Sequence, residues 1–163
     1  MIVIALGANL PSRAGEPLAT LRAALDALRQ RGVKLESVSS FYRAAAWPNP
    51  SDPPFINAVA TLATDLPPRG LMALLHDIES EFGRTRAAKN APRTLDLDLI
   101  DYEGRVEAGP PELPHPRMAG RAFVLLPLAE VAPGWRHPVT GQPVSALIAA
   151  LPKGTAMPTC LAD

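Results

Sequence analysis

One run of residues decides the fold and points to the chemistry of this chain: Leu95-Asp96-Leu97-Asp98-Leu99-Ile100-Asp101-Tyr102. In a β-strand successive side chains point to opposite faces of the sheet, so Asp96 and Asp98 would face one way and Leu97 the other. The Cα atoms of the two aspartates would then lie roughly 6.5–7 Å apart. Two carboxylates at this spacing can bracket one or two hard cations such as Mg2+.

Arginines stand just before this strand, in Gly83-Arg84-Thr85-Arg86 and in Pro92-Arg93-Thr94. Their guanidinium groups supply forked donors for phosphate oxygens. Paired carboxylates and neighbouring arginines together indicate a magnesium–polyphosphate site. The alternative is a solvated cluster of ion pairs, because Asp-x-Asp sequences are common and a short motif is only a hypothesis.

The composition excludes several classes of protein. A chain of 163 residues is most simply one domain with its own hydrophobic core. Lysine plus arginine and aspartate plus glutamate number 16 each, so no overall field attracts nucleic acid or an anionic membrane. The single cysteine, Cys160, excludes an intrachain disulfide and a cysteine-based zinc cluster. Met1–Leu6 is too short for the core of a signal peptide or for a spanning helix, so we expect a cytoplasmic protein.

Hydrophobic periodicity predicts the secondary structure. Met1–Leu6 is apolar throughout, as in a central strand buried on both faces. Leu18, Leu21, Leu25 and Leu28 recur at spacings of three and four, which predicts an amphipathic helix. In chain order the predicted elements are a strand at 1–6, a helix at about 16–31, a strand at about 33–42, a strand at 55–64, a helix at about 68–82 and a strand at 95–102.

The element order, β-α-β-β-α-β, predicts an α+β protein with a ferredoxin-like core, in which both helices pack on one face of an antiparallel sheet. Right-handed crossovers would place the first and third strands in the centre and the aspartate strand at an edge, beside the first. This core covers about residues 1–102. Residues 103–163 form a Pro-rich extension, whose apolar segments 123–131 and 144–151 are predicted to be short helices that cover part of the sheet.

Phosphate binding would rest on side chains, since the sequence has neither a P-loop nor the Gly-x-Gly-x-x-Gly turn of a dinucleotide-binding fold. A second group of candidates lies between Pro114 and Phe123. Taken alone, His115 would be a loop residue bonded to its neighbours. Arg117 and Arg121 would be solvated charges at helical spacing, and Phe123 would belong to the core.

Five blocks of sequence, considered together, change this interpretation of the single residues. They are Ser39-Ser40-Phe41-Tyr42-Arg43, Phe55-Ile56-Asn57-Ala58, Gly83-Arg84-Thr85-Arg86, Pro92-Arg93-Thr94-Leu95-Asp96-Leu97-Asp98, and Pro114-His115 followed by Arg121-Ala122-Phe123. In order and spacing they closely resemble one family, the 6-hydroxymethyl-7,8-dihydropterin pyrophosphokinases of folate biosynthesis. The resemblance runs from Ile4 to about Leu151.

The resemblance implies a ferredoxin-like fold and the transfer of a pyrophosphoryl group from ATP to the hydroxymethyl oxygen of the pterin, with release of AMP. It implies two Mg2+ ions, held by Asp96 and Asp98, and makes ATP the co-substrate. Arg84 and Arg93 correspond to catalytic, phosphate-handling arginines of a mobile loop. The implied ATP-binding residues are Arg84, Arg93, Leu99 beside the adenine, and His115 and Arg121 at the phosphates. The implied pterin-binding residues are Ala44, Ala45, Trp47, Phe55, Asn57, Asp96 and Phe123.

The residue types suit these roles. Magnesium and arginines would neutralise the oxygens around the β-phosphorus, so that a nucleophile can approach it. A flat pterin needs aromatic faces, which Phe55 and Phe123 would supply, and an amide such as Asn57 at its polar edge. The chain departs from many relatives in the loop before Pro92, where Ala87–Ala91 contains no tryptophan.

Two other functions match parts of the sequence. The first is a catalytically weak pterin- or nucleotide-binding module that keeps the site residues but does not close its loop. The second, a ferredoxin-like RNA-binding domain, is disfavoured by the net charge of zero and by the lack of an aromatic RNA-binding pattern on the third strand. The pyrophosphokinase prediction carries with it small-molecule substrates and a monomeric protein.

Overall fold

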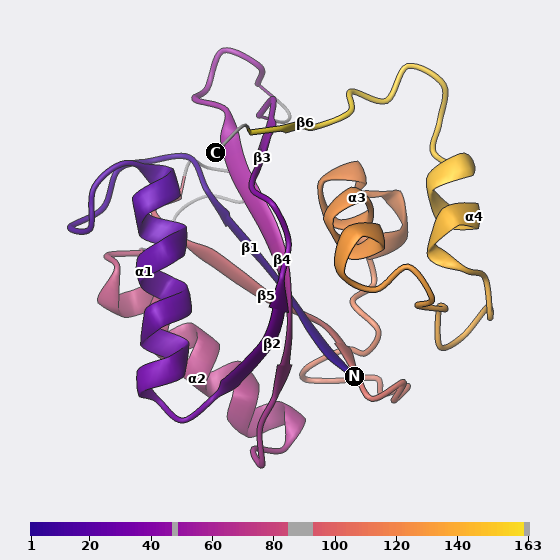
Figure 1. Ribbon diagram of the computed structural model, residues 1–163, viewed down its shortest axis with the longest axis horizontal. Coiled ribbons are helices and arrows are strands. Elements are labelled where there is room, and N and C mark those ends of the chain that lie inside the picture. The colour runs from indigo at the N-terminus through magenta and orange to yellow at the C-terminus, as the bar shows by residue number, and fades with distance from the viewer. Residues whose placement is uncertain (47–48, 85–92, 162–163) are drawn as a thin grey trace.

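A single antiparallel sheet separates two layers of helices (Figure 1). The computed structural model describes residues 1–46, 49–84 and 93–161. Helices α1 (Pro17–Gln30) and α2 (Pro68–Glu81) cover one face of the sheet, and α3 (Ala122–Val131) lies on the other with α4 (Val144–Ala149) beside it. The predicted α+β architecture is therefore confirmed, and so are the two short helices predicted after residue 103.

The sheet has six strands in the order β5-β1-β4-β3-β6, and β2 pairs with the other part of β4. As predicted, the first and third predicted strands, which are β1 and β4, are central, and the aspartate strand β5 lies beside β1 at an edge. The strands are β1 (Ile2–Ala8), β2 (Lys34–Val38), β3 (Tyr42–Ala44), β4 (Phe55–Ala63), β5 (Asp96–Tyr102) and β6 (Thr159–Cys160).

The continuous strand predicted at about 33–42 is wrong, because the chain breaks at residues 39–41 into β2 and β3. Ser39 is buried at the break. Its N–H donates to the Val59 carbonyl at 2.9 Å, and its hydroxyl accepts from the Val59 N–H at 3.0 Å. Since a serine hydroxyl takes the place of a backbone carbonyl, the strand can bend without leaving the Val59 N–H unpaired.

Helices α1 and α2 bury the leucine-rich faces predicted from the sequence. Each begins with a proline at its first position, where a missing N–H costs nothing because it would have no partner within the helix. Gly32 follows α1 in the left-handed region, at φ +84°, and lets the chain turn towards β2. The side chains that these helices bury include Leu21, Leu25, Leu28, Leu71, Leu75 and Ile78.

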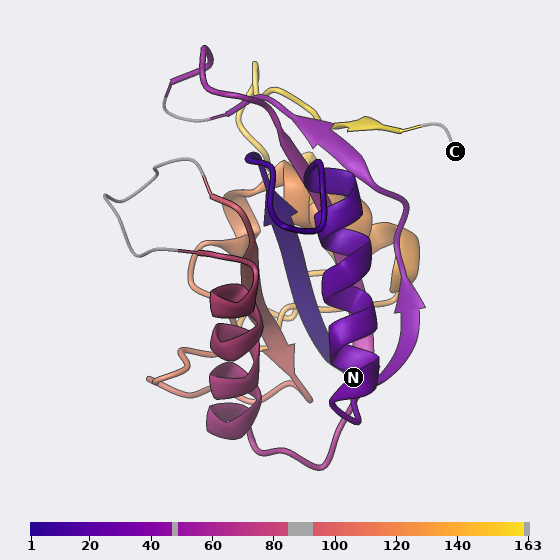
Figure 2. The same cartoon turned by 90° about the vertical axis from the view of Figure 1, so that its left-hand side faces the viewer.

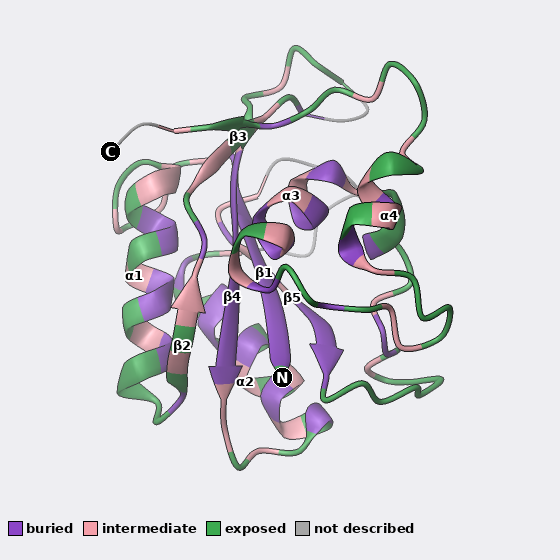
Figure 3. Ribbon diagram, turned by 45° about the vertical axis from the view of Figure 1, so that its right-hand side comes forward, coloured by how far each residue is buried: buried purple, intermediate pink, exposed green. Residues whose placement is uncertain are grey.

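Both faces of β1 are buried, as predicted for a central strand (Figure 3). Ile4 and Leu6 belong to the core beneath α1 and α2. Val3 and Ala5 point the other way, into a second core that includes Leu125 of α3. The two cores lie on opposite faces of the sheet because side chains alternate along a strand.

A buried carboxylate fastens the second helical layer to the edge strand. Asp101 of β5 accepts hydrogen bonds from the Trp135 indole N–H at 2.9 Å and from the Gly104 N–H at 3.0 Å. A buried carboxylate requires such donors. These bonds hold the chain that follows α3 against the strand that carries Asp96 and Asp98.

The C-terminal segment returns to the sheet (Figure 2). There β6 pairs with β3, and the Leu161 N–H donates to the Phe41 carbonyl at 2.8 Å. This pairing supports the short strand β3 on the side away from β4. In the described part of the chain, no helix is both long and apolar enough to cross a membrane.

Candidate active site

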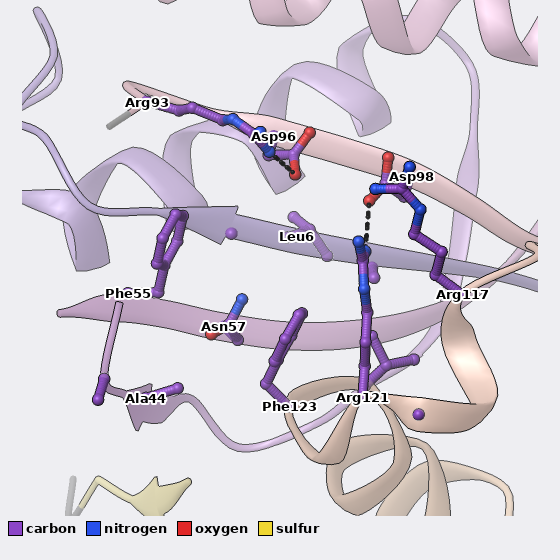
Figure 4. A pocket seen from close by; sticks show the side chains of 15 residues that line it. Leu6, Ala44, Phe55, Asn57, Arg93, Asp96, Asp98, Arg117, Arg121 and Phe123 are labelled. Carbon is purple, nitrogen blue, oxygen red and sulfur yellow. Dashed lines mark hydrogen bonds and ion pairs between the residues drawn. The ribbon is translucent and has the colours of Figure 1, made fainter. Parts of the chain in front are cut away.

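A cavity of about 560 Å³ lies over the C-terminal half of β1 and the first residues of β4 and β5, next to the start of α3 (Figure 4). Segments that are far apart in the sequence meet here. The predicted site residues among its lining are Ala44, Ala45, Phe55, Asn57, Arg93, Asp96, Asp98, Arg121 and Phe123. The other lining residues are Ala5, Leu6, Gly7, Arg117, Gly120 and Val124.

Asp96 and Asp98 line the cavity from the same face of β5, which confirms the geometry predicted from their spacing. They lie opposite Gly7 and Ala5 in the ladder with β1. Burial, and then the negative charge of Asp96, raise the pKa of Asp98 to about 6. The Arg121 guanidinium compensates only in part, because its Nη1 lies 3.9 Å from the Asp98 carboxylate.

Two arginines converge on Asp96. Arg84 Nη1 donates to Oδ1 at 2.6 Å, and Arg93 Nη1 donates to Oδ2 at 2.9 Å. Burial acts to lower the pKa of Arg84, but the carboxylates of Asp96 and Glu79 outweigh it and raise that pKa. A guanidinium carries five N–H donors, so both arginines keep donors beyond those that bind Asp96. Arg84 Nε, for example, is buried and makes no hydrogen bond to any described residue.

Glu79 of α2 supports this arrangement. Its carboxylate is buried and accepts from Arg84 Nη1 at 2.5 Å and from the Leu97 backbone N–H at 2.8 Å. Burial raises the pKa of Glu79 to about 7 against the opposing effect of the Leu97 hydrogen bond and the Arg84 charge. The available signal in the sequence was an acidic residue at helical spacing from Leu71 and Leu75, on the apolar face of α2.

Arg121 directly precedes α3, and its guanidinium lies 5.5 Å from the centre of the Phe123 ring. It therefore stands between the aspartates and the aromatic part of the cavity. Burial lowers the pKa of Arg121, yet a guanidinium stays protonated at neutral pH. Arg117 adds a second cation to this side of the cavity.

His115 borders a neighbouring hollow instead of the main cavity. Its backbone N–H donates to the Ile100 carbonyl at 2.9 Å, and its Nδ1 accepts from the Arg117 N–H at 3.2 Å. Burial, followed by the charges of Arg121 and Arg117, lowers the pKa of His115 to about 4. The imidazole is therefore neutral at pH 7, with its proton on Nε2 available as a hydrogen-bond donor.

Phe55 and Phe123 flank Asn57 in the part of the cavity away from the aspartates (Figure 4). Asn57 is buried, and its Oδ1 makes no hydrogen bond to any described residue. Gly7 makes room for this amide, because a Cβ atom there would lie 2.7 Å from Asn57 Nδ2. An unsatisfied amide oxygen between two aromatic rings suits a planar ligand with N–H donors along its edge. The role of Gly7 is not apparent from the sequence, because it depends on the neighbour of Gly7 across the ladder.

Some predicted residues lie elsewhere. Leu99 is 6% exposed and belongs to the core beneath α1 and α2, because strand alternation turns it away from the face of Asp98. Its side chain does not line the cavity, so its contact with adenine stays a prediction. Trp47 and the loop at 85–92, which includes Arg86, lie outside the described residues.

The aspartate pair suits a hard cation that brings other ligands with it. Among the described residues, no group of three or more His, Cys, Asp or Glu side chains could hold a metal ion. Two carboxylates leave most positions of octahedral Mg2+ to phosphate and water oxygens. A cation at this place would also relieve the repulsion between Asp96 and Asp98 that contributes to the raised pKa of Asp98.

Comparison with known proteins gives the class of this protein. Residues 3–133 match the sequence profile of the family described as 7,8-dihydro-6-hydroxymethylpterin-pyrophosphokinase. The chain is 43% identical over 148 residues to a 2-amino-4-hydroxy-6-hydroxymethyldihydropteridine pyrophosphokinase of Synechocystis sp., a match that covers 90% of this chain and 73% of the relative. It is 40% identical over 153 residues to the Pseudomonas aeruginosa protein of the same name, with coverage of 93% and 91%. The chain is thus an ATP-dependent transferase of the pyrophosphokinase class.

Within that class the chain belongs to the 7,8-dihydro-6-hydroxymethylpterin-pyrophosphokinase family. The crystal structure of wild-type Plasmodium falciparum HPPK-DHPS has the same fold, with a TM-score of 0.68 over 91% of this chain at 13% identity. This chain spans 44% of the length of that protein. The low identity limits this likeness to the fold.

Proposed function

We propose that the cavity is the active site for the family's reaction, the transfer of a pyrophosphoryl group from ATP to 6-hydroxymethyl-7,8-dihydropterin in folate biosynthesis. The main support for this proposal is that the cavity has two chemically different walls. Asp96 and Asp98 form an ionic wall together with Arg93 and Arg121. Phe55 and Asn57 of β4, with Phe123 of α3, form an aromatic and amide-bearing wall on the other side of β1.

The aromatic wall accounts for the pterin. The rings of Phe55 and Phe123 offer faces on which a flat heterocycle can stack. The free Oδ1 of Asn57 accepts from an N–H group at the edge of the ring, which satisfies a buried acceptor. Ala44 and Ala45 border the slot at the end of β3, and the contact of Trp47 with the pterin stays a prediction because that residue lies outside the described ranges.

The ionic wall accounts for the phosphates. Asp96 and Asp98 would hold two Mg2+ ions, which would neutralise charge at the phosphoryl groups of ATP. Arg84 and Arg93 each donate one N–H to Asp96. Their remaining N–H groups donate to the phosphate oxygens. Arg121 binds a phosphate beside Asp98. His115 donates a hydrogen bond to a phosphate oxygen from Nε2, because its Nδ1 accepts from the Arg117 N–H.

The reaction asks little covalent chemistry of the protein. The hydroxymethyl oxygen of the pterin attacks the β-phosphorus of ATP and forms a new O–P bond. The bond between the β-phosphorus and the oxygen that joins it to the α-phosphorus breaks, AMP leaves with the electron pair, and the hydroxyl proton is released. The catalytic residues Arg84, Arg93, Asp96 and Asp98 therefore act by positioning the reactants and by neutralising charge.

The remaining assignments complete the proposal. Leu99 lies near the adenine, and residues 1–163 act as one pyrophosphokinase domain. The protein is proposed to work as a monomer on its two small-molecule substrates. It works in the cytoplasm, where its substrate ATP is available.

The test is a coupled measurement of both products. Purified protein is incubated with ATP, Mg2+ and 6-hydroxymethyl-7,8-dihydropterin, and AMP and the pterin pyrophosphate are quantified. We expect them to form in equal amounts. If AMP stays at the level of a control without pterin while the pterin still binds, the chain is a binding module and the proposed activity is wrong.

A further inference from the structure

Glu130, near the end of α3, connects that helix to the chain around β3. Its carboxylate accepts a hydrogen bond from the Ser40 backbone N–H at 2.6 Å and another from the Ser40 hydroxyl at 3.1 Å. Its other oxygen accepts from the Tyr42 hydroxyl at 2.7 Å. None of these groups lines the cavity or takes part in the proposed reaction.

The bend between β2 and β3 creates the need for this acceptor. Ser40 lies in the break, where β2 pairing with β4 has ended and β3 pairing has not yet begun. Because Ser40 is exposed, its N–H bonds either to water or to an acceptor from outside the ladder. Glu130 supplies it, and so the position of the bend depends on a side chain of α3.

Strand β3 carries one border of the pterin slot. Its last residue, Ala44, pairs with Phe55, and Tyr42 pairs with Asn57. The ladders that join β3 to β4 and β6 run within the sheet. The hydrogen bonds to Glu130 run across this direction, from the sheet to the helix layer. They therefore restrain the distance between β3 and α3, which the ladders do not restrain.

Helix α3 carries the opposite border. Phe123 lies seven residues before Glu130, which is about two turns or roughly 10 Å along the helix, so both side chains lie on nearly the same face. A movement of α3 relative to β3 would therefore change the separation of Phe123 from Ala44. Glu130 is placed to prevent that movement.

The protonation states of Glu130 and Tyr42 favour the hydrogen bond between them. Burial acts to raise the pKa of Glu130, but the bonds from Tyr42 and Ser40 outweigh it and lower that pKa. Burial, and then the bond to Glu130, raise the pKa of Tyr42. At neutral pH an ionised carboxylate thus accepts from a neutral phenol, and hydrogen bonds to an ionised acceptor are about twice as strong as those between neutral groups.

We infer that Glu130 is a positioning residue for the pterin: by holding the Ser40–Tyr42 segment against α3, it sets the width of the slot between Ala44 and Phe123. This inference rests on the proposed function, since it takes the cavity to be the pterin site. It predicts that loss of the contact weakens pterin binding, whereas ATP binding and the chemical step, which depend on β5 and its arginines, continue.

The experiment compares wild type with Glu130→Ala, Glu130→Gln and Tyr42→Phe. The dissociation constant of the pterin is measured from the fluorescence of the pterin, and that of ATP by calorimetry. The turnover number kcat is measured at saturating concentrations of both substrates. All measurements are made well below the melting temperature. For Glu130→Ala we expect a five- to twentyfold weaker pterin complex, with the ATP constant and kcat within twofold of wild type. Tyr42→Phe removes one hydroxyl and should lose three- to fivefold. Glu130→Gln, which keeps one acceptor oxygen, should fall between wild type and Glu130→Ala.

Glu81→Ala is the matched control. Glu81 forms an ion pair with Arg31 on the exposed side of α1 and α2, so its loss breaks a surface contact far from β3. We expect its pterin binding to equal that of wild type. Tyr42→Phe also decides the question if Glu130→Ala does not fold. In the double variant Glu130→Ala/Tyr42→Phe, pterin binding should be no weaker than in Glu130→Ala, because both changes remove the same contact.

The outcomes separate the inference from the proposed function. If wild type binds and converts the pterin while Glu130→Ala and Tyr42→Phe bind it as tightly as wild type, the inference is wrong and the proposed function stands. Equal losses in pterin affinity, ATP affinity and kcat would also overturn it, since they indicate general damage. If wild type itself neither binds nor converts the pterin, the proposed function fails first.

Discussion

Gly7 of β1 and Asn57 of β4 face each other so closely that a methyl group at position 7 would lie 2.7 Å from the Asn57 amide nitrogen. Because β1 and β4 are central strands, neither backbone can move aside easily. The Asn57 amide would have to rotate or shift, which would remove its oxygen from the slot between the two phenylalanines.

Gly7→Ala should therefore weaken pterin binding. We expect a loss of at least tenfold, or about 1.4 kcal/mol, with the ATP dissociation constant unchanged. Asn57→Ala should lose a similar factor, and Gly7→Ala should add little in that background because the amide it displaces is gone. Gly134→Ala is the control, since a Cβ atom there meets nothing within 4 Å. Additive losses in the double variant would contradict this explanation.

Removal of either charge from the aspartate pair should stop catalysis while the protein stays folded. For Asp96→Asn and for Asp98→Asn we expect kcat to fall roughly 10²–10³-fold, because charge neutralisation at the phosphates is the main contribution of this wall. Circular dichroism and the melting temperature should show an intact fold. Near-normal turnover in both variants would rule out the metal assignment.

Arg84 and Arg93 should matter more to the chemical step than to pterin binding. In Arg84→Ala or Arg93→Ala we expect kcat to fall roughly 10²-fold and the pterin dissociation constant to change less than threefold, since neither side chain belongs to the aromatic wall. Arg29→Ala, which breaks an exposed pair with Asp26, provides the baseline. A larger effect on pterin affinity than on kcat would move both arginines to substrate recognition.

The reaction should depend entirely on a divalent cation. Treatment with a chelator should reduce AMP formation to the level of the control without pterin, and added Mg2+ should restore it. Pterin binding without ATP should be much less sensitive, because Phe55, Asn57 and Phe123 need no metal. Turnover that survives exhaustive chelation would contradict the role given to Asp96 and Asp98.

Asp98 should make the metal-free protein less stable as the pH rises. Its pKa is raised from an ordinary value of 3.8 to about 6, so the folded protein binds this proton more tightly than the unfolded chain does. Its stabilising contribution is complete below about pH 4 and is lost as the pH rises through about 6. The side chain of Asp98→Asn cannot lose a proton, so this variant should not lose stability in this way. Between pH 4 and 7 its free energy of unfolding should therefore rise relative to that of wild type by roughly 1–2 kcal/mol after allowance for solvent screening.

This pH dependence is measured by urea denaturation of both proteins at pH 4, 5, 6 and 7 without divalent cations. Asp26→Asn, on the exposed side of α1, is the control for loss of a carboxylate far from the cavity. Parallel stability curves for wild type and Asp98→Asn would show that Asp98 titrates normally.

Much of the fold follows from local pattern. The continuous apolar run of β1, the leucine spacing of α1 and α2, and the alternation in β5 each specify an element without reference to the rest of the chain. Element order and crossover handedness then determine the strand order. The break between β2 and β3 could not be predicted in this way, because it depends on a hydrogen bond from Val59, about twenty residues further along the chain, to the Ser39 hydroxyl.

The sequence is enough to place Asp96 and Asp98 on one face of a strand, because a side-chain period of two follows from backbone geometry. It also determined, through its resemblance to a family, which residues to seek in the site. The roles of Gly7, Glu79 and Glu130, in contrast, follow from tertiary packing. Each acts through a residue distant in sequence, and such contacts arise only when the strands and helices pack together.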